Sequence, residues 1–221
     1  MASDLSSQTS TEWTFADVLT HLGGIPLERI RAYPPPGTAT EKDVLEIESR
    51  TGRICELVDG VLVEKTMGYY ESRLAAIIIH LIEAFLEGHD LGIVLAPDGT
   101  LQILPGQVRI PDVCFLSWEK FPNRELPREP IPPLAPDLAI EVLSASNTEA
   151  EMQRKLRDYF TAGVRLVWYI DPESRTAQAY TSPAESVTIG EEESLSGGDV
   201  LPGFGLPLDE LFAKAGRQGP E

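Results

Sequence analysis

A glutamate inside a strongly apolar run is the first sign of chemistry in this chain. Glu141 lies within Leu-Ala-Ile-Glu-Val-Leu at residues 138–143, a pattern typical of a strand buried on both faces. A buried carboxylate is costly unless it is paired, hydrogen-bonded or bound to a metal. Glu141 therefore needs a partner, and structural pairing and a functional role agree equally well with the pattern.

Two other polar residues adjoin apolar elements. Asp112 follows a proline and opens the predicted strand at residues 112–117. Lys155 lies in a predicted helix that begins after Thr148, with Glu151 at the spacing of a capping box. At 100° per residue Lys155 falls at the edge of the apolar face, so its amine can reach a strand end. Alternatively, Asp112 is an ordinary residue at the start of a strand, and Lys155 is an ordinary solvated lysine on its helix.

These three residue types match the needs of phosphodiester hydrolysis. Carboxylate oxygens can fix a hard cation such as Mg²⁺, and a lysine can stabilise charge or help to activate water. Asp112, Glu141 and Lys155 fit that inventory. Arg109 lies close to Asp112 in the sequence and is a candidate for contact with a substrate phosphate, with a surface ion pair as the alternative.

The hydrophobic pattern predicts the elements that position these residues. Asp59-Gly60 between two apolar runs indicates a hairpin, and spacing of i, i+3, i+4 indicates a long helix over 70–87. The fold class predicted is a single α/β (α+β) domain with a mixed sheet flanked by helices. Thr40 and Asp43 have the spacing of a capping box, which indicates a short helix over 40–49, and another short helix is expected at 13–22. Strands are expected at 54–58, 61–65, 93–96, 101–104, 107–110, 112–117, 138–143, 165–170 and 176–180.

Composition shifts along the chain suggest four regions. Residues 1–12 are polar and are expected to form a disordered tail, and residues 13–50 an N-terminal helical segment. Residues 51–181 hold all the candidate residues and form the predicted core. Residues 182–221 form an acidic extension, in which 206–212 should dock on that core.

Charge and composition restrict the function classes. The formal net charge of −17 argues against broad, nonspecific affinity for nucleic acid, so such a role would need a local basic patch or a metal. The longest apolar run, residues 74–81, is too short to span a bilayer, and the N-terminus lacks signal-peptide features. A cytoplasmic protein without membrane contact is expected, with Cys55 and Cys114 as reduced core thiols rather than a disulfide.

Several short motifs, taken in order, resemble one known family. The chain is similar to the Uma-two family, whose bacterial members are usually described as "putative restriction endonuclease", in the PD-(D/E)XK nuclease superfamily. The resemblance implies a restriction-endonuclease-like fold, Mg²⁺ or Mn²⁺ as cofactor and DNA as substrate. The matching motifs are Glu56-Leu-Val-Asp-Gly, Ile110-Pro-Asp-Val, Pro136-Asp-Leu-Ala-Ile-Glu-Val-Leu-Ser, Lys155-Leu-Arg-Asp-Tyr, Ala162-Gly-Val and Tyr169-Ile-Asp-Pro.

The resemblance also assigns roles to particular residues. It implies that Asp112 and Glu141 are metal ligands, that Lys155 is catalytic and that Glu56 is an additional acidic site residue. The superfamily lysine normally lies two positions after the glutamate, where this chain has Leu143. In this family the lysine has moved to the following helix, at the position of Lys155.

Other functions remain open beside a nuclease. A catalytically silent module that keeps the fold is the leading alternative, favoured by the net charge, and a structural or regulatory homodimer is a third interpretation. Other enzyme classes lack their signatures, because no Gly-x-Ser-x-Gly elbow, phosphate-binding loop or zinc-ligand spacing occurs.

Overall fold

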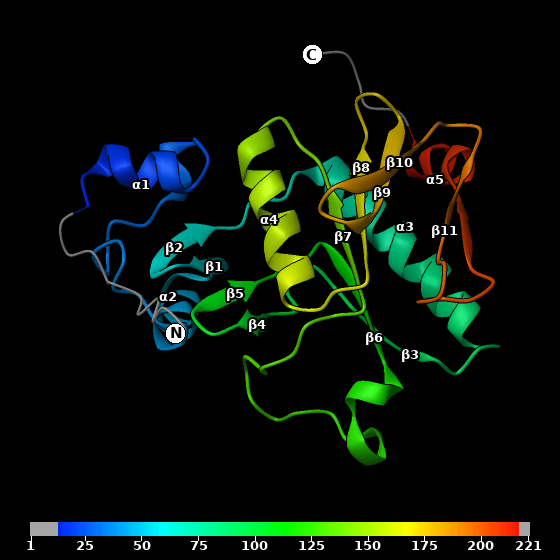
Figure 1. Ribbon diagram of the computed structural model, residues 1–221, viewed down its shortest axis with the longest axis horizontal. Coiled ribbons are helices and arrows are strands. Elements are labelled where there is room, and N and C mark those ends of the chain that lie inside the picture. The colour runs from blue at the N-terminus through cyan, green and yellow to red at the C-terminus, as the bar shows by residue number, and fades with distance from the viewer. Residues whose placement is uncertain (1–12, 217–221) are drawn as a thin grey trace, which may run out of the picture.

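A six-stranded mixed sheet forms the centre of the molecule (Figure 1). The computed structural model describes residues 13–216, so the tail predicted at 1–12 lies outside the described residues. Only β7 and β8 pair in parallel, and the other neighbours are antiparallel. The predicted mixed sheet is therefore confirmed. In spatial order the strands are β10 (Glu185–Ile189), β9 (Thr176–Ser182), β8 (Leu166–Asp171), β7 (Leu138–Val142), β6 (Val113–Ser117) and β3 (Gly92–Leu95).

A smaller antiparallel sheet carries the predicted hairpin. Asp59 and Gly60 join its first two strands with φ of 47° and 75°, the left-handed values that a two-residue hairpin turn needs. A Cβ on Gly60 would lie 2.5 Å from the Gly37 carbonyl carbon, so the close approach of that loop also requires glycine. The spatial order is β2 (Val61–Glu64), β1 (Cys55–Val58), β5 (Gln107–Arg109) and β4 (Leu101–Leu104).

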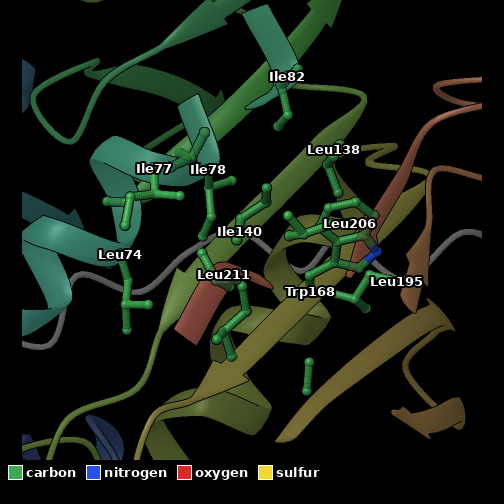
Figure 2. Close-up of a cluster of buried hydrophobic side chains, with 14 of the residues drawn as sticks. Leu74, Ile77, Ile78, Ile82, Leu138, Ile140, Trp168, Leu195, Leu206 and Leu211 are labelled. Carbon is green, nitrogen blue, oxygen red and sulfur yellow. The ribbon is translucent and has the colours of Figure 1, made fainter. Parts of the chain in front are cut away.

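Helices cover both faces of the large sheet. In the core between the sheet and α3 (Tyr69–Leu86), Leu138 and Ile140 of β7 meet the apolar side of that helix (Figure 2). Ala139, which alternates with them, packs instead with Leu156 of α4 (Glu149–Thr161) on the opposite face. Since side chains alternate along a strand, the next residue with the orientation of Ala139 is Glu141, which therefore faces α4.

The C-terminal segment has more structure than the sequence pattern indicated. The sequence predicted one docking element at 206–212, whereas the structure forms β11 (Ser194–Ser196), β12 (Gly205–Pro207) and α5 (Leu208–Ala215), in addition to β10. Leu195, Leu206 and Leu211 enter the core beside α3, as Figure 2 shows. These strands were missed because they have only three to five residues, too few for an alternating pattern to be recognised.

The N-terminal segment packs against α4, the helix that also covers the large sheet. It contains α1 (Phe15–His21), the 3₁₀ helix η1 (Leu27–Arg29) and α2 (Glu41–Thr51). The predicted capping box of α2 is present, with Thr40 and Asp43 bonded reciprocally. Arg29 makes a bidentate, buried ion pair with Glu151 of α4, at 2.7 and 3.1 Å. This pair ties the first elements of the chain to the helix that carries Lys155.

A long surface connection joins β6 to β7. It begins with two 3₁₀ turns, η2 (Trp118–Lys120) and η3 (Pro122–Arg124), and residues 122–130 are exposed. Both cysteines are buried free thiols, as predicted, and burial raises the pKa of Cys114 to about 12. Within residues 13–216, no helix combines the length and apolar character needed to cross a membrane.

Candidate active site

The sheet register brings Asp112 next to Glu141. β6 and β7 are antiparallel, with Val113 opposite Ile140, and one step further along this register Asp112 stands opposite Glu141. Directly opposed residues have Cβ atoms about 4.5–5.5 Å apart. The two strands are also tied here, because the backbone N–H of Val142 donates to Asp112 Oδ2 at 2.7 Å. Two carboxylates separated by the long β6–β7 connection thus share one edge of the site.

Lys155 reaches the same site from α4. Its helix starts at Thr148, whose hydroxyl accepts from the backbone N–H of Glu151 at 3.1 Å. The predicted capping box is only half formed, because the Glu151 carboxylate pairs with Arg29 instead of closing it. Lys155 is buried, not solvated, and its Nζ lies 3.0 Å from Glu141 Oε1 and 3.1 Å from Glu56 Oε1.

Glu56 joins the site from β1 of the small sheet. It also accepts from Arg109 Nη1 at 2.8 Å and from the backbone N–H of Ile110 at 3.2 Å. Burial opposes ionisation of Glu56, but Lys155 and Arg109 outweigh it and hold its pKa far below the ordinary range. Glu56 is therefore an ionised counter-charge that holds Lys155 in position.

Arg109 lies behind Glu56 instead of on the surface. Its guanidinium is 3% exposed and is shared between Glu56 and Asp158. The alternative of a surface ion pair is wrong because the pair is buried. A contact between Arg109 and a substrate phosphate would require one of these bonds to open, and it stays a prediction.

Glu141 has the opposite electrostatic character to Glu56. Burial is the main cause that raises its pKa, the nearby Asp112 carboxylate adds to it, and Lys155 offsets part of the shift. Tyr159, one turn after Lys155 on α4, also donates its hydroxyl hydrogen to Glu141 Oε1. The fold thus keeps Glu141 where its negative charge is only partly compensated.

Lys65, which no sequence motif indicated, completes the site. Lys65 directly follows β2, and its Nζ lies 2.8 Å from Asp112 Oδ1 and also donates to the Ile110 carbonyl. Its side chain is only 9% exposed. No local pattern could have revealed this pair, because it depends on how the small sheet sits against the large one. The sequence likewise does not show that the hydroxyl of Tyr159 reaches Glu141, because the residue follows the apolar spacing of α4.

These side chains line one small pocket. Its lining includes Glu56, Lys65, Asp112, Glu141 and Lys155, together with Arg29, Thr66, Met67, Glu71, Val142, Ser144 and Asn147. Glu71, from the first turn of α3, is a further carboxylate of this lining that no sequence motif indicated. The pocket thus brings together all of the predicted site residues except Arg109.

The donor set is compatible with a magnesium-type ion. Mg²⁺ is commonly held by one or two carboxylates, with waters and substrate phosphates filling its other positions. Asp112 and Glu141 supply two such carboxylates. Within the described part of the chain no group of three or more histidine, cysteine, aspartate or glutamate side chains is arranged to hold a metal. The residues therefore fit a cation completed by substrate and water, not a closed protein cage.

Comparison with known proteins places the chain in a family. A family model described as "Putative restriction endonuclease", Uma2, matches residues 42–209, most of the chain and all of the pocket residues except Arg29. The chain belongs to the Uma2 family. The predicted resemblance is thereby confirmed, and the segment before residue 42, including Arg29, lies outside the region that defines Uma2 proteins.

A solved structure shows the same fold. The chain is similar to a putative nuclease of the family DUF820 from Anabaena variabilis, with a TM-score of 0.66 and 19% identity over 75% of this chain and 93% of that one. At this identity the likeness establishes the nuclease-like fold of this Uma2 protein. Among curated proteins, none matches the chain.

Proposed function

We propose that this Uma2 protein is a divalent-cation-dependent nuclease that hydrolyses phosphodiester bonds in DNA. The observation that carries the proposal is the opposition of Asp112 and Glu141 across β6 and β7, with the Lys155 ammonium 3.0 Å from Glu141. Asp112 and Glu141 would hold Mg²⁺ or Mn²⁺. A divalent ion held there would neutralise phosphate charge and lower the pKa of bound water.

Lys155 serves in this proposal as a fixed positive charge. Burial alone would favour the neutral amine, but Glu141 and Glu56 raise the pKa of Lys155 well above its ordinary value. A lysine held as the ammonium cannot accept a proton from water. Its role is therefore to donate hydrogen bonds and stabilise negative charge on the phosphate in the transition state. Glu56 and Arg109 support it by fixing its position.

Charge around the pocket favours one direction of approach for DNA. A larger groove adjoins the pocket along β8, β9 and the start of α4, and its lining holds Glu71, Glu149, Asp171 and Glu173 without any lysine or arginine. Those carboxylates would repel a phosphate backbone. The pocket lining carries Arg29, Lys65 and Lys155 beside its carboxylates, so we expect DNA to approach the pocket away from this groove.

The test is cleavage of supercoiled and linear DNA with Mn²⁺ at low salt, where an acidic protein binds DNA best. Wild-type protein should cut, and Asp112→Asn and Glu141→Gln should each lose activity while keeping their fold. Lys214→Met is a matched control, because Lys214 also pairs with a carboxylate, Glu210 at 3.0 Å, but lies on α5 across the sheet. Cutting by both carboxylate variants at the wild-type rate would refute the assigned site.

A catalytically silent module is the second candidate. It is favoured by the pairing of Asp112 with Lys65 and of Glu141 with Lys155, because these ion pairs satisfy both carboxylates without any cation. On that alternative the wild-type protein would neither cut DNA nor bind Mn²⁺ at this pocket. Homodimer formation and a cytoplasmic location stay predictions for either function.

A further inference from the structure

Lys65 is bonded to the Asp112 oxygen, Oδ1, that an incoming cation would need as a ligand. Asp112 Oδ2 is bonded to the backbone N–H of Val142, which the sheet holds in place, and Oδ1 is bonded to Lys65 Nζ at 2.8 Å. A divalent ion bound to Asp112 would lie against this ammonium in a buried setting, where like charges repel strongly. Cation binding and the Lys65–Asp112 pair should therefore exclude each other.

Lys65 is also the pocket cation best able to move. Residues 65–68 connect β2 to α3 without regular structure, and lysine carries its ammonium on a flexible four-carbon stem. Lys155, in contrast, is fixed on α4 between two carboxylates, and Arg29 is committed to Glu151 by two bonds. Lys65 is paired with one carboxylate and one backbone carbonyl, that of Ile110, and lines the pocket into which its ammonium would be released.

We propose that Lys65 is a counter-ion that the divalent cation displaces, and that the released ammonium then binds a phosphate of the nucleic acid in the same pocket. This inference rests on the proposed function and adds a substrate-binding residue to it. Its consequence is positive coupling, because cation binding frees a phosphate ligand and a bound phosphate keeps Lys65 away from Asp112. Coupling of this kind must be reciprocal.

The experiment measures binding rather than cleavage. Mn²⁺ affinity is measured by calorimetry, and affinity for a phosphorothioate oligonucleotide, which keeps its charge and resists hydrolysis, by fluorescence anisotropy with and without Mn²⁺. In the wild type Mn²⁺ should strengthen oligonucleotide binding by about 5–150-fold, the usual range of coupling. Lys65→Met should bind Mn²⁺ more tightly than wild type, and its coupling should be smaller than in wild type, because only the direct contact between cation and phosphate remains. Lys214→Met, the matched control, should behave as wild type in both measurements.

Lys65→Arg tests the same idea from the opposite direction and covers the case in which Lys65→Met does not fold. A guanidinium can hold a carboxylate with two bonds, so this variant should resist displacement and bind Mn²⁺ more weakly than wild type. Unchanged or weaker Mn²⁺ binding by folded Lys65→Met would overturn the proposal, as would unchanged or tighter binding by Lys65→Arg.

Glu141→Gln separates failure of this inference from failure of the proposed function. If Glu141→Gln loses Mn²⁺ binding while folded Lys65→Met binds as wild type does, the cation site stands and Lys65 has no part in it. If Glu141→Gln binds Mn²⁺ as tightly as wild type, the cation site itself is misplaced and the role of Lys65 fails with it.

Discussion

Lys155 on α4 and Glu141 on β7 face each other inside the protein, with Nζ 3.0 Å from Oε1. The same ammonium lies 3.1 Å from Glu56 on the small sheet. One side chain thus links both sheets and the helix between them. Because all three groups are buried, changes to any of them should affect stability and function together, and the two effects must be measured separately.

Lys155→Met is expected to lower both stability and turnover. Removing one partner of a buried ion pair typically costs about 3–5 kcal/mol, because the carboxylates left behind are uncompensated. Urea unfolding at neutral pH measures this loss, and added Mn²⁺ should restore part of it. At saturating Mn²⁺, kcat should fall about 10²–10³-fold, as for loss of one preorganised charged group, with DNA affinity nearly unchanged. Equal cutting by the folded variant would show that Lys155 is structural.

Glu141→Gln should abolish stabilisation by divalent cations. A ligand that binds only the folded state raises the melting temperature, and the amide cannot replace the carboxylate charge at the cation. Thermal melts of wild type and variant with and without Mn²⁺ measure the effect. Glu48→Gln, on an exposed position of α2 away from the pocket, is the control and should keep the full shift. A shift of wild-type size in Glu141→Gln would place the ion elsewhere.

Glu141 and Glu56 should respond to pH with opposite signs. Burial raises the pKa of Glu141 above 4.5, so ionising it costs stability in the folded state once the pH exceeds 4.5. Without cations, Glu141→Gln should therefore be more stable than wild type at pH 7. That advantage should shrink as the pH falls towards 4.5, where the unfolded carboxyl is also protonated.

For Glu56 the sign is reversed. Lys155 and Arg109 overcome the effect of burial and hold its pKa below 4.5, so its charge stabilises the folded state above that pH. Glu56→Gln should be less stable than wild type at pH 7, and the deficit should shrink progressively as the pH falls below 4.5 towards the lowered pKa of Glu56. Denaturant unfolding from pH 3 to 8 tests both variants. Equal signs for the two would contradict this electrostatic account.

The Arg29–Glu151 ion pair should hold the N-terminal segment against α4. Arg29→Met leaves the buried Glu151 carboxylate uncompensated, with an expected cost of about 3–5 kcal/mol. Limited proteolysis should then cleave before residue 41 sooner than in wild type. Arg50→Met is the control, since Arg50 and Glu46 form an exposed pair at 3.8 Å, worth about 0–1 kcal/mol. Unchanged protease resistance would mean that other contacts hold the segment.

The sequence alone was enough to determine most local structure. The Asp59-Gly60 hairpin, the capping box at Thr40 and the long helix over 70–87 all follow from interactions within a few residues, and the structure contains each of them. The missed capping bond at Glu151 has a different cause. Its carboxylate is taken by Arg29, a residue 122 positions away, and no local pattern carries that information.

For the candidate site, the sequence determined which charged residues need a counter-charge. Only the tertiary structure decided which residues supply it. Glu141 was conspicuous because a charge in a buried strand is costly wherever the strand packs. Its pairing with Lys155, and that of Asp112 with Lys65, depend on strand register and on the docking of two sheets around α4. Such long-range contacts arise from packing of the whole chain, because the energy of a buried charge fixes the need for a counter-charge but not the element that supplies it.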